Sequence, residues 1–134
     1  MSTLQSDLDI SLLMVEDDPV ARNVILRMVE RRFPACTIYT AENGREGLEL
    51  YKQHSPELVI SDINMPEMNG IDMAREIRTI DPDARFIVLT AYGNQSFLQT
   101  FTEIGFCAYL LKPVNFKELF TIIESCVGKS GGGG

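Results

Sequence analysis

Five short apolar runs recur along the chain, and an amphipathic stretch follows each of them. The apolar runs span residues 12–15, 37–40, 58–61, 86–89 and 109–111. The helices predicted from the spacing of apolar residues after each run span residues 19–33, 45–54, 71–80, 94–104 and 116–127. Strands that alternate with helices in this way predict an α/β fold, a doubly wound parallel sheet with helices on both faces.

Two of the predicted helices begin with a clear capping signal. Asp18 stands before Pro19, as expected of an N-cap residue followed by proline at the first helical position. Asn115 is followed three residues later by Glu118, which is the pattern of a capping box. We therefore interpret Asp18 as a helix cap rather than as a metal ligand.

Length, composition and charge are those of one small soluble domain. Of the 134 residues, 45% are hydrophobic, and the formal net charge is −7. We expect the domain over residues 11–128, between a flexible segment 1–10 and a flexible glycine-rich tail 129–134. Nucleic-acid phosphates and anionic membranes repel a negative chain, and no apolar run approaches the roughly 20 residues that span a bilayer. Together with a first segment unlike a secretion signal, this predicts a cytoplasmic protein without nucleic-acid or membrane binding.

The cysteines give no sign of a shared site. Cys36, Cys107 and Cys126 are odd in number, lie far apart in the sequence and are flanked by apolar or β-forming residues. In a cytoplasmic protein this predicts buried free thiols and argues against a disulfide or a zinc site.

Polar residues stand where most of the predicted strands end. The second strand ends at Thr40, and functional side chains follow the other four: the acidic run 16–18, Asp62, Thr90 and Lys112. In an open parallel sheet, the functional crevice lies beyond the carboxyl ends of the strands, where the strand order reverses. The pattern therefore predicts the order 2-1-3-4-5, with the second strand at an edge away from the site.

Several carboxylates in one crevice repel each other unless a cation lies between them. All the candidate ligands are oxygens, and no histidine or cysteine is near in the sequence, so Mg²⁺ or Mn²⁺ is expected rather than zinc. Lys112 adds a positive charge opposite Asp62. A carboxylate beside a metal ion and an ammonium group is suited to attack on phosphorus, which predicts an aspartyl phosphate.

Four short motifs stand in order at these strand ends. They are Val-Glu-Asp-Asp at 15–18, Asp-Ile-Asn-Met-Pro at 62–66 with Gly70, Leu-Thr-Ala at 89–91, and Tyr-Leu-Leu-Lys-Pro at 109–113. Together they resemble the receiver domain of two-component response regulators, and the likeness covers residues 12–127. The resemblance implies a five-stranded, flavodoxin-like fold. It also implies a signalling switch that catalyses only its own phosphorylation and dephosphorylation.

The resemblance implies a role for each residue of the metal site. Asp62 would accept a phosphoryl group from the phosphohistidine of a sensor histidine kinase or a phosphotransfer protein, in a reaction that depends on Mg²⁺. Asp17 and Asp62 would bind the metal ion directly, and Glu16 would act mainly through a coordinated water. Asn64 would offer its backbone carbonyl to the same ion.

The resemblance also implies a switch. Thr90 would turn its hydroxyl towards the phosphoryl group, Tyr109 would follow between outward and inward rotamers, and Lys112 would hold the phosphoryl group. The peptide bond between Lys112 and Pro113 would be cis. Phosphorylation would then change the surface made by the fourth helix, the fifth strand and the last helix.

One departure from the family pattern bears on partners. Phe106 stands where the family usually has a small residue. Phe97, Phe101 and Ile104 have the spacing of a buried helix face, whereas Leu98 and Phe106 are harder to bury on that face. We therefore expect an apolar surface at Leu98 and Phe106 for a homodimer or an effector.

Other functions remain open at this stage. A haloacid-dehalogenase-type phosphatase also uses an aspartate nucleophile, but in an Asp-x-Asp pattern where this chain has Asn64. A flavodoxin-like cofactor binder would place phosphate where this chain carries the acidic run 16–18. A receiver that serves only as an unphosphorylated scaffold is the third alternative. His54, the single histidine, stands at a helix end and is interpreted as a surface residue, so the chain is expected to receive phosphoryl groups and not to donate them.

Overall fold

The computed structural model describes residues 8–65, 67–91 and 95–132, without the side chains of 95–98 and 128–132. In this part of the chain, five parallel strands form one sheet in the order β2-β1-β3-β4-β5, as predicted. The strands are β1 (Ser11–Val15), β2 (Thr37–Ala41), β3 (Leu58–Asp62), β4 (Phe86–Thr90) and β5 (Ala108–Leu111).

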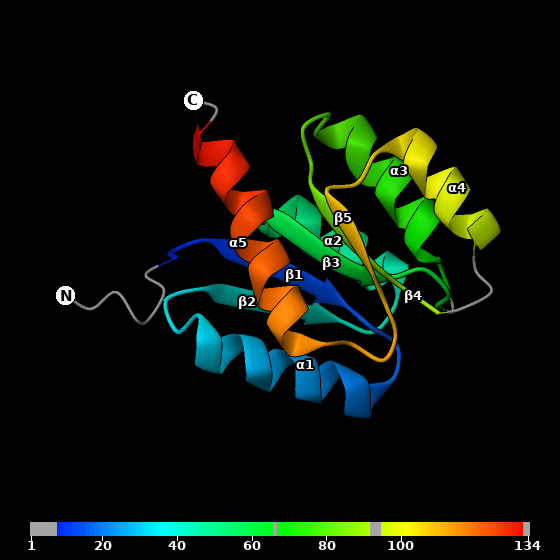
Figure 1. Cartoon of the computed structure of the whole chain (residues 1–134). Helices are drawn as coiled ribbons and strands as arrows, with labels where there is room; N and C mark the ends of the chain where they lie inside the picture. Colours follow the sequence, from blue (N-terminus) through cyan, green and yellow to red (C-terminus); the bar gives the residue numbers. More distant parts are fainter. Residues whose placement is uncertain (1–7, 66, 92–94, 133–134) are drawn as a thin grey trace.

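A helix follows each strand, so the chain winds over both faces of the sheet (Figure 1). The helices are α1 (Pro19–Arg32), α2 (Gly44–His54), α3 (Gly70–Ile80), α4 (Gln95–Ile104) and α5 (Phe116–Gly132). Helices α1 and α5 cover one face, and α2, α3 and α4 cover the other. The last helix was predicted to end near Val127, before the glycine-rich tail. In the structure it continues through Gly128 to Gly132, and that part of the prediction was wrong.

Neighbouring residues of each strand point to opposite faces and build two separate cores. In β1, Leu13 and Val15 pack with α2, α3 and α4, whereas Leu12 and Met14 pack with α1 and α5. Strands β3 and β4 are buried along their whole length. Burial on both faces explains why these strands read as almost unbroken apolar runs in the sequence.

Side-chain caps fix where the helices start. The Asp18 carboxylate accepts a hydrogen bond from the amide of Val20 at 3.2 Å, which confirms its role as the α1 cap. The Asn115 side chain accepts one from the amide of Glu118 at 3.0 Å, in front of α5. Asn43 and Asn69, which the sequence analysis did not single out, cap α2 and α3 in the same way. Since α1 and α3 follow β1 and β3, their caps also fix the loops that carry the acidic residues.

The cysteines differ from the prediction. Cys107, just before β5, and Cys126, on α5, form a disulfide with their Cα atoms 6.1 Å apart. The prediction of free thiols was wrong for this pair because it used their sequence separation of 19 residues. The chain turns back after β5, so α5 brings Cys126 next to the strand that it follows. Cys36 is free and half-buried, and its thiol donates to the carbonyl of Leu8 at 3.5 Å.

The ring of Phe106 packs against other aromatic rings. Its ring packs against Phe101 at 6.2 Å and against Tyr109 at 6.0 Å, and Phe101 is fully buried as predicted. Phe106 is partly buried against the edge of the core, and the expected partner surface at Leu98 and Phe106 stays a prediction. The side chains of Phe97 and Leu98 lie outside the described residues, and the exposed apolar side chains of β5 are those of Tyr109 and Leu111.

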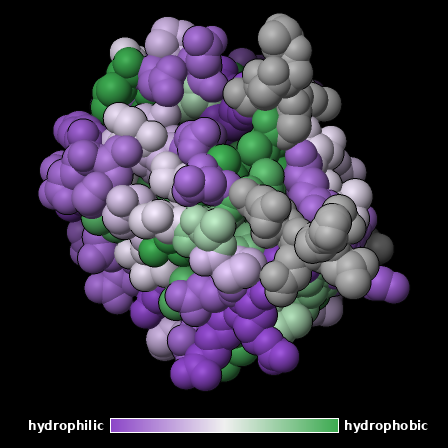
Figure 2. Space-filling model, turned by 90° about the vertical axis from the view of Figure 1, so that its left-hand side faces the viewer, coloured by the Kyte–Doolittle hydropathy of each residue, from purple (hydrophilic) through white to green (hydrophobic). Residues whose placement is uncertain are grey.

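One face of the molecule is mostly polar. Hydrophilic side chains cover most of the face shown in Figure 2, and hydrophobic ones appear there in small separate groups. Among the described residues, no helix combines the length and the apolar character needed to cross a bilayer.

Candidate functional site

Three carboxylates meet at the edge of the sheet where the strands end. Glu16 and Asp17 belong to the loop between β1 and α1, and Asp62 is the last residue of β3. One oxygen from each lies within 4.8 Å of the others. Glu16 and Asp62 are almost entirely buried, at 1% and 7% exposure, whereas Asp17 is open to solvent. Such a set of oxygens fits a hard divalent cation that keeps part of its coordination shell as water.

The backbone and one arginine hold Glu16 in place. Its amide donates to the carbonyl of Ala41 at 3.0 Å, and its own carbonyl accepts from the Arg22 guanidinium at 2.8 Å. Its side chain accepts from the amide of Asp18 at 3.1 Å. Glu16 is therefore fixed from both sides, and the cap residue of α1 takes part. Arg22 was missed by the sequence analysis, and its position six residues after Glu16, inside α1, gives no signal of this contact.

Lys112 joins the two buried carboxylates. Its ammonium lies 2.5 Å from one oxygen of Asp62 and 3.2 Å from Glu16. The other oxygen of Asp62 accepts from the amide of Ile63 at 2.7 Å. The Lys112 amide donates to the carbonyl of Thr90 at 2.8 Å, and the following bond to Pro113 is cis, as expected. The lysine is thus directed into the site by the pairing of β5 with β4.

The charges at this edge are strongly coupled. Burial raises the pKa of the Glu16 carboxyl, and the negative charge of Asp62 raises it further. The Asp18 amide and the Lys112 charge act in the opposite direction but do not outweigh these effects. Burial alone would lower the pKa of Lys112, yet its bonds to Asp62 and Glu16 raise it overall. Lys112 is therefore an ammonium at neutral pH, and the site still favours additional positive charge.

Gly70 allows α3 to begin directly beside Asp62. A Cβ atom at this position would overlap the carbonyl oxygen of Asp62. The Gly70 amide donates to the carbonyl of Ile63 at 2.8 Å, which closes the loop after β3. The presence of glycine at position 70 of the sequence motif thus has a steric reason.

The other predicted site residues surround this cluster to different degrees. Thr90 ends β4, is buried, and donates its hydroxyl to the carbonyl of Ala91 at 3.4 Å. Asn64 is exposed two residues after Asp62. Tyr109 is exposed on β5, where its ring contacts Phe106. The structure therefore brings Glu16, Asp17, Asp62 and Lys112 together. Of the other three, Thr90 ends the strand next to β3, and no hydrogen bond or ion pair joins Asn64 or Tyr109 to the cluster among the described residues.

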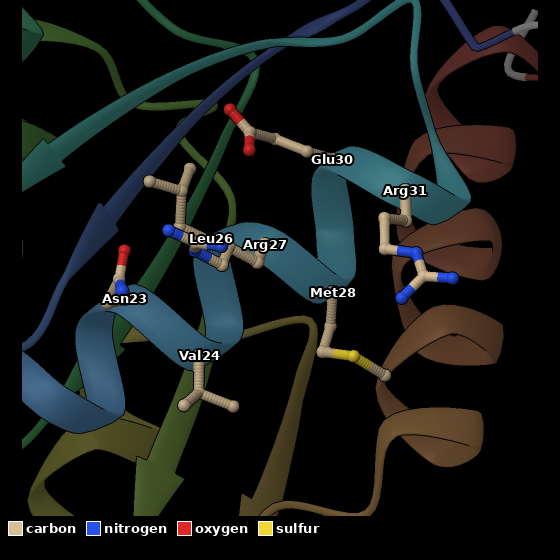
Figure 3. A pocket seen from close by; sticks show the side chains of 7 residues that line it. All are labelled: Asn23, Val24, Leu26, Arg27, Met28, Glu30 and Arg31. Atoms are coloured by element: carbon tan, nitrogen blue, oxygen red, sulfur yellow. The ribbon is translucent and has the colours of Figure 1, made fainter.

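An apolar surface of α1 begins beside the cluster. Val20 and Val24 are 70% and 45% exposed, although their spacing in the sequence equals that of the buried Ile25 and Val29. In Figure 3, Val24 and Met28 project from one side of the helix and Glu30 from the other. The groove along this helix has a volume of about 600 Å³ and is lined by Asn23, Val24, Leu26, Arg27, Met28, Glu30 and Arg31. The sequence signal for this exposed surface was that α1 carries two apolar stripes, one with Val20, Val24 and Met28 and one with Ile25 and Val29. The sheet covers only the second stripe fully.

Known proteins resemble this chain in sequence and in fold. Residues 12–124 match the model of the response regulator receiver domain. The chain is 36% identical over 112 residues to the chemotaxis protein CheY of Bacillus subtilis, which covers 84% of this chain and 93% of that protein. It is 35% identical over 117 residues to an uncharacterized response regulatory protein of Staphylococcus epidermidis, or 87% of this chain. The chain spans only 46% of the length of that second relative.

A solved structure agrees with the sequence matches. The CheX–CheY complex of Borrelia burgdorferi with BeF3 and Mg²⁺ superposes with a TM-score of 0.77 and 26% identity, over 87% of each chain. The match of the family model covers most of the chain, including the acidic pocket and the lysine. The chain therefore belongs to the response regulator receiver domains of two-component systems.

Proposed function

We propose that the chain is the phosphoacceptor of a two-component phosphorelay in the cytoplasm. Asp62 accepts a phosphoryl group from the phosphohistidine of a sensor histidine kinase or a phosphotransfer protein, in a reaction that depends on Mg²⁺ or Mn²⁺. The observation that carries the proposal is the meeting of three carboxylates within 4.8 Å with the ammonium of Lys112. The family consists of signalling switches, and the chain would act as one by catalysing only its own phosphorylation and dephosphorylation.

The geometry supports Asp62 as the nucleophile. One of its oxygens is engaged by the amide of Ile63 and the other by Lys112, so the carboxylate has a fixed orientation. In the reaction, a carboxylate oxygen forms a bond to phosphorus while the bond from phosphorus to the donor imidazole nitrogen breaks. The electron pair of that bond remains on the nitrogen. Lys112 stays protonated and neutralises charge on the phosphoryl oxygens.

The donor set fits the metal ion that the family implies. Asp17 and Asp62 would hold it directly, Glu16 through a water, and Asn64 through its backbone carbonyl. A bound divalent cation supplies charge neutralisation between the carboxylates and the phosphoryl oxygens. The pKa of Glu16 is raised by burial and by Asp62, which is the electrostatic reason why the pocket favours a cation.

Phosphorylation would act on the neighbouring strand ends. A phosphoryl group adds about −1.5 to −2 charges at one place. Thr90 would turn towards it and Tyr109 would change rotamer, which alters the surface of α4, β5 and α5. The ring of Phe106 packs on Tyr109 at 6.0 Å, so a movement of Tyr109 would reach it. We keep the surface at Leu98 and Phe106 as the proposed contact for a homodimer or an effector.

The phosphodonor would bind next to the acidic cluster. The exposed Val20 and Val24 begin one turn after Asp17, the solvent-exposed member of the cluster. An apolar surface at the mouth of the site suits a protein donor, whereas a small donor does not need it. Replacing Val24 by glutamate should therefore slow transfer from a phosphotransfer protein and leave phosphorylation by acetyl phosphate unchanged.

Chemical identification of the phosphorylated residue tests the proposal. The protein is treated with acetyl phosphate and Mg²⁺, and the modified site is mapped by peptide mass spectrometry before and after neutral hydroxylamine. An acyl phosphate on Asp62 is cleaved by hydroxylamine, whereas an ester on serine or threonine survives. Modification of another residue, or a product that resists hydroxylamine, would refute the proposal.

A further inference from the structure

The disulfide joins the start of β5 to α5. Cys107 is half-buried, and its amide donates to the carbonyl of Phe86 in β4 at 2.8 Å. Cys126 is almost completely buried on the side of α5 that faces the sheet. One sulfur is therefore fixed to the sheet and the other to the helix, so the bond ties the helix to the sheet.

The loop that this bond closes contains functional groups of the receiver. Strand β5 begins just after Cys107 and ends just before Lys112, whose ammonium contacts Asp62. Tyr109 and Leu111 expose their side chains between these points. Figure 1 shows α5 returning along the sheet against the direction of β5. The two sulfurs thus close a covalent loop around the lysine and the exposed part of β5.

Both cysteines border a groove at the end of the sheet opposite to the acidic cluster. The groove has a volume of about 420 Å³ and is also lined by Arg78, Asp83 and Arg85. Arg78 donates to the carbonyl of Ile104 at 2.9 Å, and Arg85 donates to the carbonyl of Cys126 at 2.9 Å. Two guanidinium groups and one carboxylate leave the groove positive. A small anionic molecule is therefore attracted to the groove, where Cys107 is the more exposed of the two cysteines.

The cellular compartment bears on whether this disulfide is structural or redox-sensing, and here the inference rests on the proposed cytoplasmic function. Disulfides are rare in the cytosol of most organisms, and those that form there are usually transient, catalytic or redox-sensing. A bonded pair at the border of an accessible, positive groove fits the redox-sensing class. Cys36 lies elsewhere, against Leu8, and has no cysteine partner in the described residues.

We propose that Cys107 and Cys126 form a redox-active pair that exchanges with small anionic disulfides at this groove and controls how tightly α5 is held to β5. In oxidation, the thiolate of one cysteine attacks the small disulfide and releases one small thiolate. The second cysteine then attacks the mixed disulfide and releases the other small thiolate. Two electrons pass from the cysteine pair to the small disulfide, and the two thiol protons pass to the solvent or to the released thiolates.

Reduction should loosen the end of α5. Leu119 and Ile123 are fully buried and keep the first half of the helix on the sheet without the bond. The segment after Ile123 is held by Cys126, by the hydrogen bond from Arg85, by the partly exposed ion pair of Glu124 with Arg32 at 3.1 Å and by the partly buried Val127. Opening a loop of this length should lower the melting temperature by roughly 10 °C. Amide exchange should increase mainly from residue 124 onwards.

The test is alkylation of the intact protein after equilibration over a series of reduced to oxidised glutathione ratios. We expect Cys107 and Cys126 to lose reactivity together in one two-electron transition, while Cys36 remains alkylated. The variant Cys36→Ala should keep this transition and Cys107→Ala should lose it. These two half-buried positions make a matched pair. Two thiols that stay reduced over the whole series, or that end only as glutathione adducts, would overturn the proposal.

A second measurement tests the control of α5 in the same samples. Hydrogen exchange and melting temperature should differ between the two redox forms. Equal values would show that the disulfide does not control how tightly α5 is held to β5. Phosphorylation by acetyl phosphate with Mg²⁺ is measured alongside. If neither redox form is phosphorylated, the proposed function fails while the cysteine chemistry stands. If both are phosphorylated but the cysteines never pair, only the redox proposal fails.

Discussion

The two ends of the sheet differ in what their charged groups do. At the carboxyl ends of the strands, the acidic edge (Glu16, Asp17, Asp62 and Lys112) gathers three carboxylates around one ammonium. At the opposite end, the disulfide end (Arg78, Arg85, Cys107 and Cys126) uses guanidinium groups to bind backbone carbonyls. The first end concentrates repulsion that a ligand can relieve, whereas the second holds elements together. Phosphoryl chemistry and the attachment of α5 to the sheet are thus separated along the strands, and substitutions at each end should have different effects.

The largest expected difference, in the rate of phosphorylation, follows from removing one positively charged side chain at each end. Lys112→Met removes the ammonium that contacts Asp62, and the rate of phosphorylation by acetyl phosphate should fall by about 10²- to 10³-fold. Arg85→Met removes a hydrogen bond at the disulfide end and should leave that rate within about twofold. Intact-mass time courses measure both rates. Equal losses in the two variants would contradict the separation of roles.

Metal ions should stabilise the protein through the acidic edge alone. A ligand at about 100 times its dissociation constant stabilises the folded state by about 2.7 kcal/mol. Mg²⁺ should therefore raise the melting temperature of the wild type, and a chelator should reverse the effect. Asp17→Asn should lose most of this increase, while Asp83→Asn, at the groove of the disulfide end, should keep it.

A Cβ atom at Gly70 should disturb the acidic edge through its backbone. Gly70→Ala brings the new atom into the carbonyl of Asp62, so we expect a loss of roughly 2 kcal/mol in the free energy of unfolding. Gly47→Ala is the matched control. There the closest atoms belong to side chains, the Met73 sulfur at 2.7 Å and a Val15 methyl group at 3.0 Å, which can shift more easily than the backbone carbonyl beside Gly70, so the loss should be smaller. Urea unfolding of both variants measures the difference, and an unaffected Gly70→Ala would refute the steric role.

The smallest expected effect is a pH dependence that comes from Glu16. Its pKa is raised in the metal-free folded protein, first by burial, so the folded state binds the proton more tightly than the unfolded state. Stability from this group is present below its ordinary pKa of 4.5 and is lost as the pH rises through the raised value. Glutamine does not ionise, so Glu16→Gln should not lose stability in this way as the pH rises. The stability of Glu16→Gln relative to the wild type should therefore improve as the pH rises from 4.5 through the raised pKa of Glu16.

The pH series needs a control for the general loss of negative charge. Glu30→Gln, at an exposed position of α1, removes one carboxylate away from the acidic edge. Unfolding is followed in the presence of a chelator, so that metal binding does not mask the effect. A stability difference between Glu16→Gln and the wild type that stays constant with pH would show that Glu16 is not electrostatically strained.

The acidic edge could be predicted from the sequence because each of its members lies at the end of a strand or within two residues after it. Parallel strands bring their carboxyl ends to one side, so Asp62 and Lys112 are neighbours once the strand order is known. The strand order itself followed from which strand end lacked a functional residue. The caps Asp18 and Asn115 were also predictable because a cap acts on the next few residues.

The disulfide end could not be predicted in this way. Cys107 and Cys126 meet because α5 packs back across β5, and their separation of 19 residues does not reveal this contact. The hydrogen bond from Arg22 to the carbonyl of Glu16 and the packing of Phe106 on Phe101 could not be predicted either. These contacts depend on how helices lie on the sheet, which apolar spacing alone does not specify. The exposure of Val20 and Val24 was missed for the same reason.

The dependence of phosphorylation on a divalent cation tests the central claim most directly. The rate of mass increase with acetyl phosphate is measured for the wild type and for Asp62→Asn, each with Mg²⁺ and with a chelator. The account predicts one phosphoryl group on the wild type with Mg²⁺, and little or none in the other three samples. Equal modification of the wild type with and without the cation, or of Asp62→Asn, would contradict it.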